Sequence, residues 1–196
     1  RNPTILLHDG YANLPFSKKE VDNLSPLFET NILLQDAAQK KAFLDLAGNY
    51  RILHLATHGM ANFENPSHSH LLFHAASSED STANILYNYE IQNLQLNADL
   101  AVLSACETGL GKVHDGEGVY GLSRSFIKSG TSNLMVSLWK VADKSTQEFM
   151  TGYYAKLIQG SKSPARSISE MKRNFSRSEL AKPYYWAPFV LIRNKL

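Results

Sequence analysis

The sequence contains a single cysteine, Cys106, among its 196 residues, which excludes a disulfide bond within the chain. It has no apolar run long enough to span a membrane, and no signal peptide opens it. Neither sign of charge is in large excess, because 20 Lys and Arg residues balance 18 Asp and Glu residues. Such a balance produces no strong field for nucleic acid or anionic lipid. We therefore expect neither a nucleic-acid partner nor a membrane partner.

What the sequence does contain is the composition of an ordinary globular domain. Apolar residues make up 43% of the chain and charged residues 19%. The length suits one domain with a full core. The chain starts at Arg1 without an initiator methionine, so we expect it to be an excised piece of a longer protein. A cytoplasmic location is a hypothesis that this N-terminus does not test.

Segments typical of strands alternate along the chain with segments typical of helices. The first two helices are predicted to begin at Ser17 and Asp36, which are common N-cap residues, and Glu20 completes a capping-box pattern with Ser17. The alternation predicts an α/β fold with a mostly parallel, six-stranded sheet. The predicted strands are 4–7, 32–34, 51–57, 99–104, 134–141 and 189–192, the predicted helices are 17–28, 36–48, 88–94, 119–128, 143–158 and 164–177, and a short strand or hairpin is predicted at 71–75.

Two of these strands end in residues that carry chemistry. His58 and Gly59 lie at the end of the strand at 51–57, and Cys106 follows the strand at 99–104. In open α/β sheets, reactive groups gather at the carboxyl ends of neighbouring strands. If these two strands are adjacent and parallel, His58 and Cys106 face each other across one end of the sheet.

A thiol and an imidazole in this arrangement are the groups that a cysteine peptidase needs. A free thiol with a pKa of about 8.5 is mostly protonated at neutral pH, and an imidazole can accept that proton and later return one to the leaving amine. Gly59 lets the main chain approach a substrate closely, so its N–H and that of Cys106 can donate to a developing oxyanion. No carboxylate stands out as a third member, and a backbone carbonyl is sufficient to orient the imidazole.

Five short sequence motifs, which occur in a characteristic order along the chain, make its resemblance to a known family specific. It resembles the CHAT domains, caspase-like modules that are often attached to tetratricopeptide repeats and are related to separase. The resemblance implies a caspase-like three-layer sandwich and endopeptidase activity on protein substrates, without a cofactor. It extends from about residue 14 to the C-terminus and rests on H-L-A-T-H-G (54–59), L-S-A-C-E-T-G (103–109), G-E-G-V-Y-G-L-S-R-S-F (116–126), S-L-W-K-V-A-D (137–143) and Y-W-A-P-F-V-L (185–191).

The resemblance also implies roles for individual residues. His58 and Cys106 correspond to the catalytic dyad of the family, and Gly59 corresponds to an oxyanion donor. It further implies that residues 1–196 form a single domain truncated at its N-terminal side. The expected partners are a protein substrate and repeat domains elsewhere in the parent chain.

Three other residues are candidates for substrate binding. Asp143 follows the S-L-W-K-V run, and it is interpreted either as an N-cap or, by the likeness to separase, as the receptor of a basic substrate side chain. Glu107 is either a substrate contact, a solvent-facing loop residue or the partner of an arginine. Trp139 belongs either to the core or to a pocket wall.

The remaining histidines and glycines bear on alternative functions. We interpret His54 as a packed or hydrogen-bonded core residue that helps to shape the site, because strand alternation puts it on the same face as the candidate base. His68, His70 and His74 lack a fourth ligand for zinc, so no metal site is predicted. The glycines within 109–118 lack the Lys-Ser/Thr ending of a phosphate loop, which argues against a nucleotide-binding domain. A catalytically silent scaffold or signalling module is the alternative to a peptidase.

Overall fold

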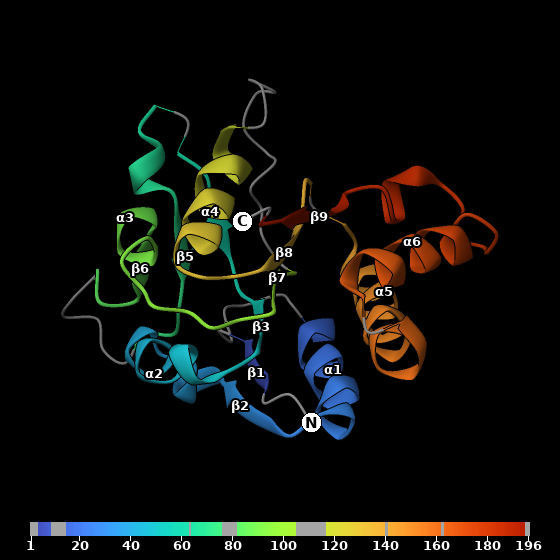
Figure 1. The fold of residues 1–196 in the computed structure, drawn as a ribbon, viewed down its shortest axis with the longest axis horizontal. Helices are drawn as coiled ribbons and strands as arrows, with labels where there is room; N and C mark the ends of the chain where they lie inside the picture. Colours follow the sequence, from blue (N-terminus) through green and yellow to red (C-terminus); the bar gives the residue numbers. More distant parts are fainter. Residues whose placement is uncertain are drawn as a thin grey trace.

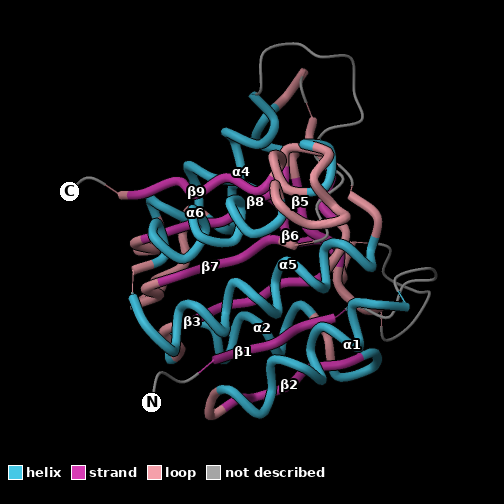
Figure 2. The backbone as a smooth tube through the Cα atoms, turned by 90° about the vertical axis from the view of Figure 1, so that its right-hand side faces the viewer, coloured by secondary structure: helices cyan, strands magenta, loops and turns pink. Residues whose placement is uncertain are grey.

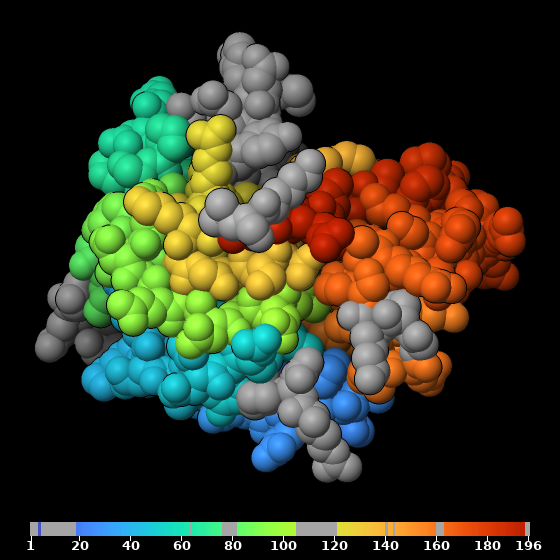
Figure 3. Space-filling view, viewed as in Figure 1, coloured from blue at the N-terminus to red at the C-terminus, as the bar shows by residue number. Residues whose placement is uncertain are grey.

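The computed structural model describes residues 4–8, 15–62, 64–75, 82–104, 117–139, 141–161 and 163–194. Within these ranges the chain forms a six-stranded sheet with helices on both faces and a separate three-stranded sheet (Figure 1). In the space-filling view, the C-terminal helices in orange and red form one flank of the molecule, and the residues in teal and green form the opposite flank (Figure 3). The layered α/β arrangement that the sequence predicts is confirmed.

The six-stranded sheet has the strand order β2-β1-β3-β7-β8-β9, which can be followed in Figure 2. The first five strands in this order are parallel, and β9 runs antiparallel to β8. Every residue of the central strands β3 and β7 is buried, as expected for strands covered on both faces. The strands are β1 (Thr4–His8), β2 (Thr30–Leu34), β3 (Ile52–Ala56), β7 (Leu100–Leu103), β8 (Asn133–Ser137) and β9 (Phe189–Arg193).

Different helices lie on the two sides of this sheet (Figures 1 and 2). Side chains alternate along β3 between two cores, so that Ile52 packs on one side while Leu53 and Leu55 pack on the other. On the side of Ile52 lie α1 (Pro15–Leu24), α5 (Asp143–Lys156) and α6 (Pro164–Phe175), and on the other side lie α2 (Lys40–Leu46), α3 (Asn88–Ile91) and α4 (Glu117–Lys128). Short 3₁₀ turns are formed by Ser25–Leu27, Gln35–Ala37, Ala47–Asn49, Pro66–His68 and Pro183–Tyr185, and a π-helical turn by Leu157–Ser161.

A second, antiparallel sheet begins just beyond the end of β3. It consists of β4 (Gly59–Met60), β5 (His70–Leu72) and β6 (Ile85–Tyr87). The sequence predicts only a short strand or hairpin in this region, because strands of two or three residues give almost no alternation signal. Gly59, which directly follows the candidate base, is thereby held in a paired strand.

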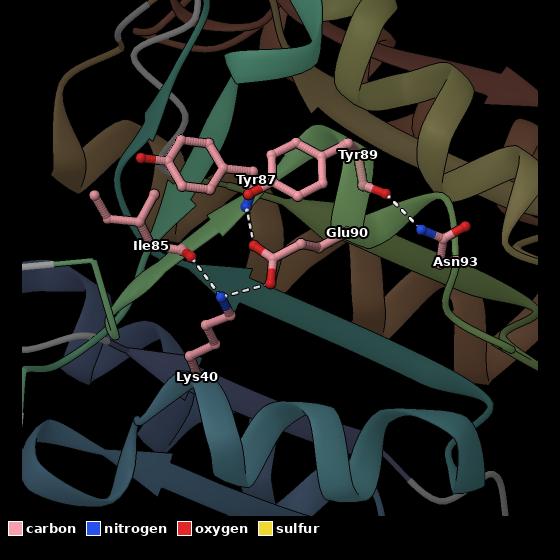
Figure 4. A network of polar contacts seen from close by, with 6 residues as sticks. All are labelled: Lys40, Ile85, Tyr87, Tyr89, Glu90 and Asn93. Carbon is pink, nitrogen blue, oxygen red and sulfur yellow. Dashed lines mark hydrogen bonds and ion pairs between the residues drawn. The ribbon is translucent and has the colours of Figure 1, made fainter.

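Polar contacts fasten this small sheet to α2 (Figure 4). The Lys40 ammonium lies 2.7 Å from Glu90 Oε1 and donates a hydrogen bond to the Ile85 carbonyl at 2.8 Å. Glu90 also accepts from the main-chain N–H of Tyr87 at 2.9 Å, and the Tyr87 ring stacks on Tyr89 with centroids 5.3 Å apart. The network joins α2, β6 and α3, and it therefore fixes the small sheet against the main layer.

The start of α1 differs from the predicted one. The helix begins at Pro15 rather than near Ser17, and proline is tolerated in a first turn because its missing N–H has no helical partner there. Glu20, which was predicted to complete a capping box, is 2% exposed and lies 2.8 Å from His54. Glu20 therefore contacts His54, a residue distant in sequence, in place of the local capping role that its pattern predicts.

The start of α2 differs as well. Asp36 was predicted as the N-cap, but it lies in a separate 3₁₀ turn, and Gln39 is extended before the helix begins at Lys40. The Asp36 carboxylate lies 3.2 Å from His74 Nε2 instead. A pattern of local residue types does not encode this long-range contact.

Two adjacent tyrosines of α5 are buried with different hydrogen-bonding environments. The Tyr154 hydroxyl lies 3.1 Å from His54 Nδ1. The Tyr153 hydroxyl is buried and has no hydrogen-bond partner among the described residues. Burial raises the pKa of both phenols above the ordinary value of 10.0. Both side chains therefore stay protonated while the protein is folded.

We expect Tyr153→Phe to raise the free energy of unfolding by about 1 kcal/mol, because it removes a buried hydroxyl that forms no bond. The matched variant Tyr154→Phe is expected to lower it by about 1 kcal/mol, because His54 loses a partner. Since folding raises both pKa values, the free energy of unfolding of the wild type is unaffected by these phenols' ionisation below pH 10 and falls as the pH rises above it, where the phenols of the unfolded chain ionise first. Urea unfolding at pH 7 and above pH 10 measures these effects; equal stabilities of the two variants at pH 7 would contradict the assignment.

Candidate active site

The strands β3 and β7 are adjacent and parallel, as the candidate dyad requires. Leu55 of β3 lies opposite Leu103 of β7. The main-chain N–H of Ser104 extends this pairing by donating to the Leu55 carbonyl at 3.1 Å. Both strands therefore end at the same edge of the sheet, with His58 two residues beyond the end of β3 and Ser104 directly beyond the end of β7.

His58 lies where the chain passes from the main sheet to the small sheet. Its carbonyl accepts from the Leu72 N–H at 2.8 Å, and the hydroxyl of the preceding Thr57 donates to the Leu72 carbonyl. Gly59 is buried and pairs with Leu71. These contacts with β5 fix the backbone around His58, whose side chain is partly exposed.

Cys106 and Glu107 lie outside the described residues, so their roles stay predictions. Asp143 is the first residue of α5, and the non-helical N-cap position is held by Ala142. The interpretation of Asp143 as an N-cap is therefore wrong by one residue. Its other predicted role, as the receptor of a basic side chain, stays a prediction.

Trp139 lies beyond the end of β8, which stops at Ser137 rather than at residue 141 as predicted. The chain turns there, because the Ser137 hydroxyl donates to the Trp139 carbonyl at 2.6 Å. The indole N–H donates to the Tyr184 carbonyl at 3.2 Å, and the half-buried ring packs against the core on the α5 side. This position is compatible with both predicted roles, core residue and pocket wall.

His54 is buried and hydrogen-bonded, in agreement with the interpretation of the sequence. Its Nδ1 lies 3.1 Å from the Tyr154 hydroxyl, its Nε2 lies 3.4 Å from Ser104 Oγ, and the same Nε2 lies 2.8 Å from Glu20 Oε1. The carboxylate oxygen is at ion-pair distance from the ring, but this oxygen forms no hydrogen bond among the described residues. One imidazole thus contacts α5, the end of β7 and α1.

The sequence reasoning missed Glu20 as a partner of His54. Glu20 is followed by Val21 and Leu24, which are fully buried, so all three residues belong to the inward stripe of α1. A carboxylate in an apolar stripe costs free energy unless it is paired. That conflict was the available signal that Glu20 has a buried partner.

The family model of the CHAT domain matches residues 6–194. The chain belongs to the CHAT domain family. Tetratricopeptide repeat protein 28 of Homo sapiens is 33% identical over 103 residues, which cover 53% of this chain and 4% of that protein. The protein of the same name from Mus musculus is 31% identical over 103 residues, with the same coverage. This CHAT domain therefore matches only a small fraction of the length of these relatives.

The fold of this CHAT domain is similar to that of separase. The structure of the Saccharomyces cerevisiae separase–securin complex matches it with a TM-score of 0.62 at 13% sequence identity. The match covers 98% of this chain and 12% of the separase chain. At this identity the likeness concerns the fold, which is the predicted caspase-like α/β arrangement.

Three histidines that lie between β4 and β6 in the sequence of the CHAT domain make separate aromatic and ionic contacts. His68 and His70 both meet the ring of Tyr87, at 6.0 and 5.5 Å between centroids, and His74 pairs with Asp36. Among the described ranges, no three His, Cys, Asp or Glu side chains are grouped so that they could hold a metal ion. In the same ranges, no helix has the length and apolar character that crossing a membrane requires.

Proposed function

We propose that this CHAT domain is a cysteine endopeptidase in which Cys106 is the nucleophile and His58 is its acid/base partner. The observation that carries the proposal is the parallel pairing of β3 and β7, with Leu55 opposite Leu103. The two segments that bear the imidazole and the sulfur therefore leave the sheet side by side. Membership of the CHAT family and the separase-like fold support the same type of reaction.

The length of chain between the described residues and the nucleophile also supports the proposal. Ser104 is bonded to Leu55 at the edge of β3, and Cys106 comes only two residues later. Two residues span at most about 7 Å. The chain therefore restricts Cys106 to the neighbourhood of the edge at which β3 and β7 end, as the proposal requires.

The proposed reaction proceeds through an acyl-enzyme. His58 accepts the thiol proton of Cys106, and the thiolate attacks the carbonyl carbon of the scissile peptide bond. The tetrahedral adduct collapses when His58 returns a proton to the leaving amine, which breaks the C–N bond. Water, deprotonated by His58, then hydrolyses the thioester and releases the carboxylic acid product and the free thiol.

The main chain at Gly59 is suited to the oxyanion of this adduct. In an antiparallel ladder, hydrogen-bonded and non-hydrogen-bonded pairs alternate. Because the His58 carbonyl accepts from Leu72, the pair of Gly59 and Leu71 is a non-hydrogen-bonded one. The Gly59 N–H is then directed away from β5, and we propose it as one oxyanion donor, with the Cys106 N–H as the second.

We further propose that the substrates are proteins cleaved after a basic residue. Asp143 would receive the basic side chain through charge-assisted hydrogen bonds, and Trp139 and Glu107 would line the same cleft. The relatives named as tetratricopeptide repeat proteins support the proposal that repeat domains accompany this domain in its parent chain. Such repeats would recruit a substrate or an activator.

The experiment that tests this function is covalent labelling by peptide acyloxymethyl ketones. We expect a probe that ends in Arg to add its mass at Cys106, and to do so faster than probes that end in Asp or Leu. Cys106→Ala and His58→Ala are expected to remove the labelling, and Asp143→Asn is expected to remove the preference for Arg. No labelling under any condition, with the fold intact, would favour a catalytically silent scaffold.

A further inference from the structure

A buried polar network connects β3 and the end of β7, the two strands that lead to the candidate dyad. His54 is four residues before His58 on the same strand, and its Nε2 lies 3.4 Å from Ser104 Oγ, two residues before Cys106. His54 is 0% exposed, and Ser104 is 6% exposed. No step of the proposed reaction uses this imidazole.

The protonation of the network follows from its contacts. A bare ring nitrogen 2.8 Å from a carboxylate oxygen would be repelled by it, so we assign the hydrogen of the imidazole to Nε2, from which Ser104 Oγ can accept it. The Tyr154 phenol, whose pKa is raised by burial and further by Tyr153 and Glu20, keeps its proton and donates to Nδ1. The groups facing His54 are therefore Glu20 from α1, Tyr154 from α5 and Ser104 from the end of β7.

The orientation of the imidazole is thus set from three sides. Tyr154 and Glu20 hold the ring from the two helices, and the ring then presents its Nε2–H to the Ser104 hydroxyl. Ser104 is fixed a second time by its own main-chain bond to Leu55. Ser104, which precedes Cys106 by two residues, is therefore bound to β3 through both its side chain and its backbone.

We propose that Glu20, His54 and Ser104 are positioning residues that set the nucleophile-bearing end of β7 relative to His58. The inference rests on the proposed function, because it concerns the pairing of Cys106 with His58. These three side chains do not touch substrate; they act by holding one strand end against the other. A loss of this restraint weakens the thiol–imidazole pair without removing either member.

The test is the pH dependence of iodoacetamide alkylation of the intact chain, which reports Cys106 alone because it is the single cysteine. In the wild type, we expect the thiol to react with a midpoint below the ordinary value of about 8.5, and His58→Ala to restore that ordinary value. Ser104→Ala and Glu20→Gln are expected to move the midpoint upwards and to slow alkylation at pH 7 roughly fivefold, as for the loss of one hydrogen bond. Thermal unfolding confirms that each variant is folded.

A control serine separates positioning from a general loss of packing. Ser129 is equally buried, and its hydroxyl donates to the Phe126 carbonyl at 2.9 Å at the far end of α4. Ser129→Ala is expected to alkylate like the wild type. If Ser104→Ala and Glu20→Gln also match the wild type while His58→Ala does not, the positioning role is overturned and the proposed function stands. If the wild-type midpoint is ordinary and insensitive to His58→Ala, the proposed function fails and the positioning role fails with it.

Discussion

Replacing His58 with alanine is expected to slow peptide hydrolysis by about 10²–10⁴-fold, the range typical for the loss of a general base. The imidazole has two tasks in the proposed reaction, to take the thiol proton and to protonate the leaving amine. Its backbone is fixed by the bond between its carbonyl and the Leu72 N–H, so the substitution removes the ring and leaves the strand in place. The measurement is kcat/KM on a fluorogenic peptide that ends in Arg.

The matched control for this variant is His74→Ala. The His74 ring is also partly exposed, but its Nε2 pairs with Asp36 beside α2 rather than facing the ends of β3 and β7. Its loss is expected to leave kcat/KM within about twofold of the wild type, since surface ion pairs of this kind contribute little. Equal losses in His58→Ala and His74→Ala would show that the assay responds to stability and not to the proposed base.

The second large effect is expected at Gly130, where alanine should lower the free energy of unfolding by about 3 kcal/mol or more. Gly130 lies two residues after the end of α4 and has a φ of +110°, a region that side chains rarely adopt. A Cβ there would overlap the Leu96 carbonyl oxygen, which is main chain and cannot rotate away. The two segments are also joined by a hydrogen bond from the Leu96 N–H to the Ser129 carbonyl at 2.6 Å.

Gly121→Ala provides a control in the same helix. A Cβ at Gly121 would lie 3.5 Å from the Asn88 side chain and 3.7 Å from Pro66, which are ordinary contacts. Because alanine is the better helix former, we expect this variant to be about 0.5–1 kcal/mol more stable than the wild type. Urea unfolding curves of both variants give the comparison. A Gly130→Ala protein as stable as Gly121→Ala would contradict the described turn.

The parts of the fold that the sequence predicts well are those with strong local patterns. The central strands β3 and β7 were predicted within two residues, because a short unbroken apolar run in an α/β chain is typical of a strand covered on both faces. Gly130 marks the end of α4 as expected for a residue of positive φ. The sequence leaves the order of these strands open, and the parallel pairing of β3 with β7 in the structure meets the condition on which the candidate dyad depends.

The parts that were missed depend on contacts between distant residues. Glu20 and His54 are far apart in sequence, and the capping-box pattern gave Glu20 a plausible local role that its buried partner overrides. Asp36 was assigned to a cap in the same way and pairs with His74 instead. The small sheet of β4, β5 and β6 has strands too short to show a period, and it became visible only through its pairing. Local patterns describe segments, whereas these features arise from packing between segments.

The central claim is that the sulfur of Cys106 meets the imidazole of His58 at the edge shared by β3 and β7. The most direct measurement is a crystal structure of the protein after reaction with an arginine-terminated peptide ketone. We predict a covalent bond between Cys106 Sγ and the inhibitor, with a ring nitrogen of His58 within about 4 Å of that sulfur. An unmodified Cys106 sealed in the interior, with its side chain turned away from His58, would contradict the proposal.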